Sequence, residues 1–148
     1  MNTAADPILN DVLVSLHRSL LQYVAEAWPW ADAHSVATRD AVLAQSVLQH
    51  HTVEQLASLL RDRGYPIQFG TYPDFSHLNY VSLDFLLTRL IADQQRVVAD
   101  CEAAARELAD DPEDGAVLNT VAVAERERLA ALRALQQTSR AAAPSRAG

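Results

Sequence analysis

Apolar residues recur every three or four positions along most of this chain, and this spacing constrains the fold more than any other feature of the sequence. The most regular stretch places Leu83, Leu87, Leu90, Gln94, Val97, Cys101, Ala104 and Leu108 on one helical face. Residues repeated with a period near 3.6 share one side of an α-helix, which is then buried against other helices. Only Gln94 interrupts this apolar stripe. The sequence therefore predicts an all-α protein.

Three further segments show the same spacing, so we expect four helices, near residues 7–27, 39–63, 83–109 and 114–137. Asp6-Pro7 is a helix start, because Asp caps free amides and Pro fits the first helical position. Thr38 is expected to cap the second helix, and Gly64 to end it. The predicted core consists of Leu16, Leu20, Leu48, Leu56, Leu87, Leu90, Val97, Val121, Leu129 and Leu132.

A connection of unusual length joins the second and third predicted helices. Residues 64–82 contain several Gly and Pro residues, and their aromatic side chains are Tyr65, Phe69, Tyr72, Phe75 and Tyr80. A helix of about 20 residues is about 30 Å long, so this segment can run the length of a bundle with its rings packed against the outside. We therefore expect the second and third helices to be parallel, in a four-helix bundle with one long crossover.

The two chain ends and the first corner set the limits of the expected domain. Trp28-Pro29-Trp30 ends the first helix, because a residue before proline avoids helical angles, and the two tryptophans are expected to plug one end of the bundle. Residues 138–148 carry no large apolar side chain, which is typical of a mobile tail. The sequence thus predicts one bundle domain over residues 1–137 and a tail over 138–148.

Charge and composition exclude several classes of protein. With a net charge of −7 and no clustered basic residues, the chain lacks a surface for phosphates, so no nucleic-acid partner is expected. No apolar run approaches the roughly 20 residues that span a bilayer, and Met1–Pro7 does not read as a secretory signal. We therefore expect a cytoplasmic protein without a membrane partner. Cys101 is expected to be a buried, inert thiol.

Short segments resemble the ferritin-like superfamily, in particular the bacterioferritins and Dps proteins. The segment from His51 to Pro66 is similar to the end of their second helix, and Val121–Leu135 looks like their fourth. Gln22-Tyr23 is similar to a pair common in bacterioferritin. The resemblance implies a di-iron centre held by a Glu from each of two helices and a Glu-x-x-His from each of the other two, within a bundle that forms homo-oligomers.

Most of the expected ligand positions carry other residues. On the second helix His51 matches the histidine, but Leu48 stands three positions before it where the family has Glu. The first-helix position falls near Leu16, and the third helix offers Asp93 or Gln94. Two iron ions need several carboxylates for neutralisation. The ligand set of a di-iron centre is therefore largely absent.

The fourth helix keeps Glu125 but has Arg128 where the family has His. Glu125 lies between Val121 and Leu129 on the apolar stripe, so it should face the core. A buried carboxylate needs a partner, and a permanently charged Arg repels a metal ion. We therefore expect a polar layer in the middle of the bundle without bound iron, made of His17, His51, Gln94, Glu125 and Arg128.

Three functional hypotheses remain open at this point. The leading one is a ferritin-like bundle with a degenerate metal centre, acting as a non-catalytic structural or interaction protein and forming homo-oligomers. The alternative is a protein that binds iron or another transition metal for oxidation or storage, through His51, Glu54 and Glu125, or through the pair His50 and Glu54 with a further carboxylate. A third is a small-ligand carrier with residues 65–80 as a lid. No enzyme motif is recognised.

Overall fold

The computed structural model describes residues 4–28 and 33–142, and every regular element within these ranges is a helix. The elements are α1 (Ala5–His17), α2 (Leu20–Glu26), α3 (Ala33–Asp62), the 3₁₀ helix η1 (Ser76–Tyr80), α4 (Leu83–Glu107) and α5 (Pro112–Ala142). The predicted all-α class is confirmed. Among the helices described, none is long and apolar enough to span a membrane.

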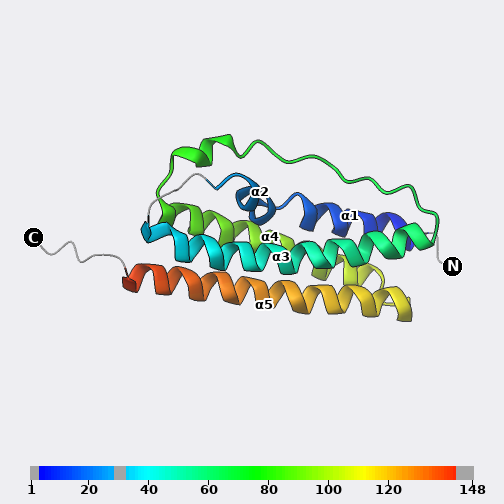
Figure 1. Cartoon of the computed structure of the whole chain (residues 1–148). Coiled ribbons are helices and arrows are strands. Elements are labelled where there is room, and N and C mark those ends of the chain that lie inside the picture. The colour runs from blue at the N-terminus through cyan, green and yellow to red at the C-terminus, as the bar shows by residue number, and fades with distance from the viewer. Residues whose placement is uncertain (1–3, 29–32, 143–148) are drawn as a thin grey trace, which may run out of the picture.

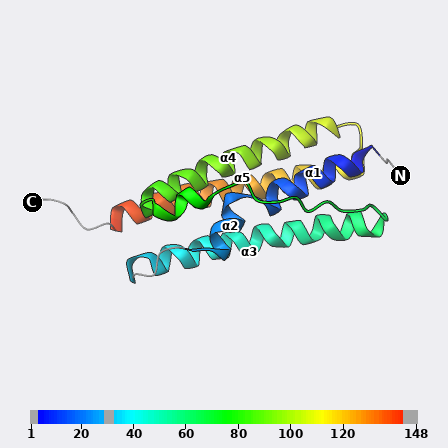
Figure 2. The same ribbon diagram turned by 90° about the horizontal axis from the view of Figure 1, so that it is seen from above.

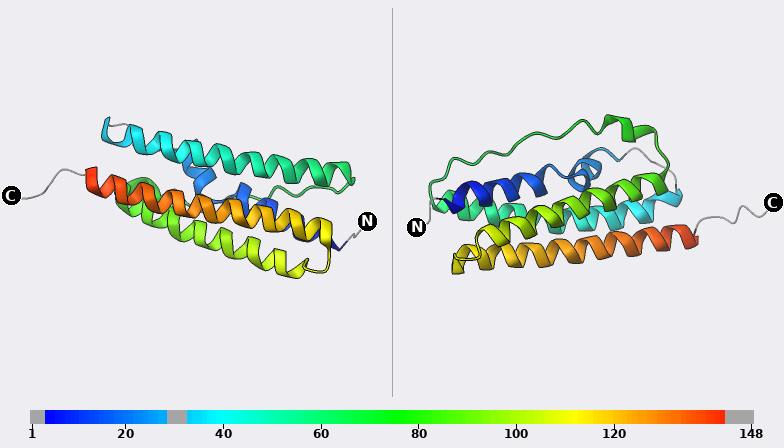
Figure 3. Two further views of the ribbon diagram at one scale, coloured as in Figure 1. Left: turned by 90° about the horizontal axis from the view of Figure 1, so that it is seen from below. Right: turned by 180° about the vertical axis from the view of Figure 1, so that it is seen from behind.

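The three long helices, α3, α4 and α5, lie side by side, and the shorter α1 packs along the C-terminal half of α3 (Figure 1). The chain runs in the same direction along α3 and α4 and returns along α5. Residues 63–82 leave the end of α3 and pass outside α1 and α2 to reach the start of α4, as the views from the front and from behind show (Figures 1 and 3).

The first predicted helix is interrupted, which corrects the expectation of one continuous helix. α1 ends at His17, and Arg18 leaves helical geometry with φ −107° and ψ 22°. Ser19 then caps α2 by accepting an amide hydrogen bond at 3.4 Å, and Asp93 of α4 accepts the Leu20 N–H at 2.8 Å. These caps satisfy amides that the break exposes. α2 turns away from the axis of α1 toward α3 (Figure 2).

Two other predicted boundaries are corrected. α3 begins at Ala33, so Thr38 lies inside the helix and does not cap it. α5 continues to Ala142, so residues 138–142 are helical where a tail was predicted. Ala and Arg are good helix formers, which lets the helix continue without any large apolar side chain. Pro29 and Trp30 lie outside the described residues, and so do residues 143–148 of the predicted tail.

Two separate clusters of buried apolar side chains fill the interior. The α1-side core includes Leu9, Leu13, Leu16, Val53, Leu56, Leu60, Val97, Cys101, Leu118 and Val121. The α2-side core consists of Leu20, Leu21, Val24, Val42, Leu78, Leu86, Leu87 and Leu90, with Trp28 packed against it. Every residue of the predicted core is buried except Leu48, of which 55% is exposed.

The error at Leu48 shows how α3 is turned. Gln49 is fully buried, whereas Leu48 and His51 lie on the surface. Apolar and polar residues alternate irregularly in the middle of this helix, so its period did not reveal which side faces inward. The inward face of α3 is therefore polar at its centre, which positions the site described below.

The segment after α3 is attached to α1 and α2 through its backbone and its rings, as expected. The Asn10 side chain exchanges two hydrogen bonds of 3.0 Å with the backbone of Gln68. The Phe69 ring meets His17 at 5.8 Å between centroids. At Gly70, φ is +68° and a Cβ would lie 2.7 Å from Val14 Cγ1. Only glycine therefore fits there without displacing a neighbour.

Candidate functional site

A layer of buried polar side chains separates the two apolar cores. It consists of Ser19, Gln22, Gln49, Gln94, Glu125 and Arg128, contributed by α2 and its cap, α3, α4 and α5. We call these six residues the polar layer. Ser19, Gln49 and Glu125 are fully buried, and Arg128 is 5% exposed. Because burial of an unpaired polar group is costly, the hydrogen bonds of this layer decide whether it can exist without a ligand.

Glu125 is the centre of the polar layer and accepts hydrogen bonds from three side chains. Its Oε1 accepts from Gln49 Nε2 at 2.8 Å and from Gln94 Nε2 at 3.0 Å. Its Oε2 accepts from Arg128 Nη2 at 2.5 Å and from Arg128 Nε at 3.2 Å. Both carboxylate oxygens are therefore occupied, and the charge of Glu125 is matched by a guanidinium on the same helix, three residues away.

The three glutamines extend the network across the interior to α2. Gln49 Oε1 accepts from Ser19 Oγ at 2.9 Å and from Gln22 Nε2 at 3.0 Å. Gln22 Nε2 also donates to the Ser46 carbonyl at 2.9 Å, and Gln94 Nε2 donates to the Glu125 carbonyl at 3.1 Å. These bonds connect α2, α3, α4 and α5 at one level. A fully connected buried network of this kind rigidifies an interior and fixes the register of its helices.

The structure brings only part of the predicted polar layer together. Gln94, Glu125 and Arg128 are in it, as expected. His51 is exposed on the outer side of α3, which corrects its placement in the core. His17 is half-buried beside His50, with 6.2 Å between their ring centroids. The side chains that donate hydrogen bonds to Glu125 are those of Gln49, Gln94 and Arg128. Both corrections follow from the turn of α3 and from the break after α1.

Sequence reasoning missed Ser19, Gln22 and Gln49. Two signals were present: Gln49 belongs to a polar stretch in the middle of a helix where leucine would serve packing, and Gln22 follows Leu20 and Leu21 on a buried turn. Ser19 gave no signal, because the apolar period continues across the break that it caps. Its role depends on the start of α2, which the sequence did not predict.

The candidate metal ligands His51, Glu54 and Glu125 do not converge. Glu125 is enclosed in the polar layer, whereas His51 and Glu54 are exposed, and Glu54 Oε1 lies 3.4 Å from His50 Nε2. Within residues 4–28 and 33–142, no group of three or more His, Cys, Asp or Glu side chains is arranged to hold a metal ion. The polar layer itself presents one carboxylate, three amides, one hydroxyl and a guanidinium, a donor set that does not fit two iron ions.

Cys101 lies in the α1-side core, as expected. Burial, followed by the nearby charge of Glu125, raises the pKa of its thiol to about 12. The thiolate is the reactive form of cysteine. Cys101 is therefore an unreactive part of the core.

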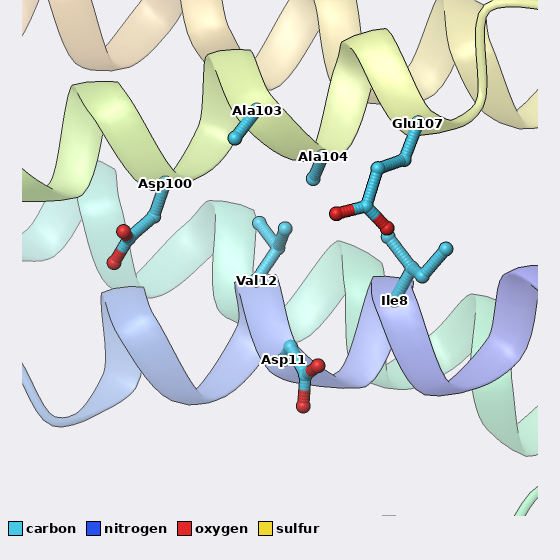
Figure 4. A pocket seen from close by; sticks show the side chains of 7 residues that line it. All are labelled: Ile8, Asp11, Val12, Asp100, Ala103, Ala104 and Glu107. Carbon is cyan, nitrogen blue, oxygen red and sulfur yellow. The ribbon is translucent and has the colours of Figure 1, made fainter.

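A surface hollow of about 250 Å³ lies between α1 and α4 and is lined by Asp11, Asp100 and Glu107 together with small apolar side chains (Figure 4). The three carboxylates point in different directions in Figure 4. Asp100 is already bound to Ser15 Oγ and to Arg96 Nη1, both at 2.8 Å. This hollow therefore has the charge of a cation site without its converging geometry.

A more apolar groove runs between α3 and α5, which lie next to each other in the view from below (Figure 3). Two hollows of about 360 and 350 Å³ share Thr52 and together extend from Gln45 to Leu59 of α3. Leu48, which is 55% exposed, lines the groove together with Leu59, Val117 and Ala131. Exposed apolar area of this kind is typical of an interaction surface or a ligand-binding groove.

Comparison with models of known protein families, with curated proteins and with solved structures finds no match.

Proposed function

We propose that this chain is a ferritin-like four-helix bundle in which a hydrogen-bonded polar layer replaces the metal centre, and that it serves as a non-catalytic structural or interaction protein. In this interpretation α1 and α2 together correspond to the first helix of the bundle, and residues 63–82 to its long crossover. The direction of α3, α4 and α5 is the one that this topology requires (Figure 1).

The inward face of α3 changes how this helix aligns with the family motif, which the sequence had placed at Leu48 and His51. The Glu-x-x-His position on this helix is Gln49-x-x-Thr52, and both residues are buried. On α5 the same spacing falls on Glu125 and Arg128, and on α4 the single position falls on Gln94. On α3, α4 and α5 the ligand positions of the family pattern therefore lie in or beside the polar layer, and Glu125 is the family ligand that remains on these three helices.

The observation that carries the proposal is the Arg128–Glu125 ion pair. Arg128 holds both oxygens of the remaining carboxylate, and Gln49 and Gln94 complete its hydrogen bonds. A metal ion could bind Glu125 only by displacing a buried guanidinium, which would then be left without its partner. The site is thus closed to metal by its own charges.

Anaerobic titration with Co²⁺ as a spectroscopic stand-in for Fe²⁺ tests this proposal. The wild-type chain should show no visible d–d bands and no rise in melting temperature. A variant with Gln49→Glu, Thr52→His, Gln94→Glu and Arg128→His, which restores the family pattern on three helices, should gain both. Co²⁺ bands in the wild type that Glu125→Gln abolishes would contradict the proposal. A restored variant that stays folded and binds no Co²⁺ would contradict the ligand-position assignment.

The α3–α5 groove is the surface through which we propose that the chain associates with a second copy of itself. A chain of net charge −7 repels its own copy, except along a face with little net charge. Among the residues lining the groove, the acidic and basic ones are Glu127 and Arg128, and Arg128 is already paired with Glu125; most others are apolar or neutral. A two-fold axis along the groove would place like surfaces together, as in isologous dimers.

Light scattering coupled to size exclusion, over a series of protein concentrations, tests the association. The wild-type chain should be dimeric, and Leu48→Glu should make it monomeric by introducing a charge into the groove. Phe85→Glu is the matched control, because Phe85 is also an exposed apolar residue but lies on α4. A monomeric wild type, or a Leu48→Glu variant that remains dimeric, would contradict this surface.

A further inference from the structure

A second group of polar side chains lies outside the polar layer, where His50, the residue after Gln49 in α3, faces His17. His50 of α3 approaches His17 at the end of α1, and the Phe69 ring covers the other side of His17 edge-on. His17 Nδ1 is buried and has no hydrogen-bond partner. His17 is therefore held between α3 and the segment after it by ring contacts, with one nitrogen left unsatisfied.

The same segment depends on the residue next to His17. Arg18 Nε donates to the Phe69 and Gly70 carbonyls, both at 3.1 Å, and its guanidinium carbon lies 4.8 Å from the centre of the Tyr72 ring. Around Phe69, this segment therefore contacts two neighbouring side chains, of which Arg18 is always charged and His17 is neutral above its lowered pKa. A proton on His17 would place a second cation beneath this segment.

We propose that protonation of His17 loosens residues 65–75 from α1, so that this segment acts as a pH-sensitive latch. A protonated imidazole has two N–H donors, and Nδ1 has no acceptor in the attached state, so a charged His17 would bury an unpaired donor. Release of the segment gives that nitrogen access to water. The latch is attached when His17 is neutral and released when it is charged.

The charges around His17 agree with this direction. Burial lowers the pKa of His17 below its ordinary value, and Arg18, directly after α1, and His50 on α3 lower that pKa further, whereas Glu26 of α2 and Glu54 of α3 oppose them. Because the released state has the higher pKa, it binds more protons, and release becomes more favourable as the pH falls through the ordinary value of about 6.5. The effect levels off below the pKa of the attached state.

Chymotrypsin cleavage after Phe69 in the native chain measures the release, with the rate divided by that of an unfolded peptide of the same sequence. Between about pH 7.5 and pH 5.5 the normalised rate should rise, by at most about tenfold for each pH unit. His17→Phe keeps a ring at this position without a proton to gain and should make the normalised rate independent of pH. His77→Gln, which removes an exposed histidine of η1, should behave as the wild type.

Two results would overturn the latch: a wild-type rate that does not change with pH, or the same pH dependence in His17→Phe. An NMR titration provides a second measurement. The His17 ring of the wild-type chain should titrate below the ordinary histidine value of about 6.5, and His50→Gln should move the His17 midpoint upward. A wild-type His17 midpoint at or above the ordinary value would also refute the proposal.

Discussion

Gln49 and His50 are neighbours in the sequence, yet they belong to the two most different polar groups of this molecule. Gln49 points inward to the polar layer, where both oxygens of Glu125 and the amide groups around it have partners. His50 points outward to His17, whose Nδ1 is buried without a partner. The hydrogen bonds of the polar layer are complete, whereas protonation of His17 would add an unpaired buried donor to the second group.

Burial alone therefore does not make a polar residue a functional candidate. The polar layer is the more deeply buried group, and its closed network argues for a structural role. The histidine pair is more exposed, and its incomplete hydrogen bonding makes it sensitive to pH.

Replacing Glu125 should have the largest effect on stability. Glu125→Leu leaves the buried guanidinium of Arg128 without its partner, which should lower the free energy of unfolding by about 3–5 kcal/mol. Glu125→Gln keeps hydrogen-bonding groups in place and should cost less, about 1–3 kcal/mol. Urea denaturation followed by circular dichroism measures both. Equal losses would show that hydrogen bonding in this layer contributes little.

The double variant Glu125→Leu, Arg128→Met is the control for that experiment. Because it removes both charges, it should be more stable than Glu125→Leu alone, as found when buried ion pairs are replaced by apolar residues. If the loss of unfolding free energy in the double variant equals the sum of the losses in Glu125→Leu and Arg128→Met, the two side chains are not coupled.

The facing of α3 can be tested with two leucines on the same helix. Leu56 is 2% exposed in the α1-side core, and Leu56→Ala should lower the free energy of unfolding by about 2–5 kcal/mol. Leu48 lies one residue before Gln49 and is mostly exposed in the single chain, so Leu48→Ala should stay within about 0.5 kcal/mol of the wild type at concentrations where both are monomeric. The reverse order in chemical denaturation would place Leu48 and His51, and not Gln49, on the inward face of α3.

Two glycines with left-handed backbone angles test how the segment over His17 is attached. Gly64, with φ +72°, has no atom within 4 Å of an added Cβ, so Gly64→Ala should cost only the backbone strain of about 1–2 kcal/mol. Gly70→Ala adds a clash with Val14 and should cost more. It should also raise chymotrypsin cleavage after Phe69 at neutral pH, relative to an unfolded peptide of the same sequence. Equal melting temperatures for the two variants would show that Val14 yields easily.

The smallest effect is expected at the exposed ion pair between Arg140 and Asp84. Arg140 Nε lies 2.7 Å from Asp84 Oδ1, and both side chains are more than half exposed. The Arg140 hydrogen bond lowers the pKa of Asp84, but solvent and salt screen such pairs. Arg140→Gln should leave the melting temperature unchanged within error at physiological salt. A loss comparable to that of Glu125→Gln would contradict this ranking of buried over exposed pairs.

The sequence was sufficient for those parts of the fold that depend on apolar periodicity. α4 has the clearest period, and its core positions were predicted correctly, including Gln94 as the exception. The break between α1 and α2 could not be predicted, because Leu16 and Leu20 keep the helical spacing while Asp93, distant in sequence, supplies a cap. In α3 the polar residues on both faces concealed which amide is buried.

The same limits apply to the polar layer. Glu125 and Arg128 were predictable because they lie three residues apart within an otherwise apolar stripe. Gln49 required the turn of α3, which is set by contacts with α1, α2 and α5. His17 was expected at the centre of the bundle, but the chain leaves the helix immediately after it, and its ring lies beneath Phe69.

We propose that the polar layer closes the interior of this helical protein to metal ions. The most direct test is elemental analysis of the full chain, expressed with added iron and purified without chelator, beside Glu125→Ala as the matched variant. We expect only trace iron in both proteins, because the Glu125 carboxylate is already held by Arg128, Gln49 and Gln94. Stoichiometric iron in the wild-type chain that is lost in Glu125→Ala would contradict the claim and identify a metal-binding protein.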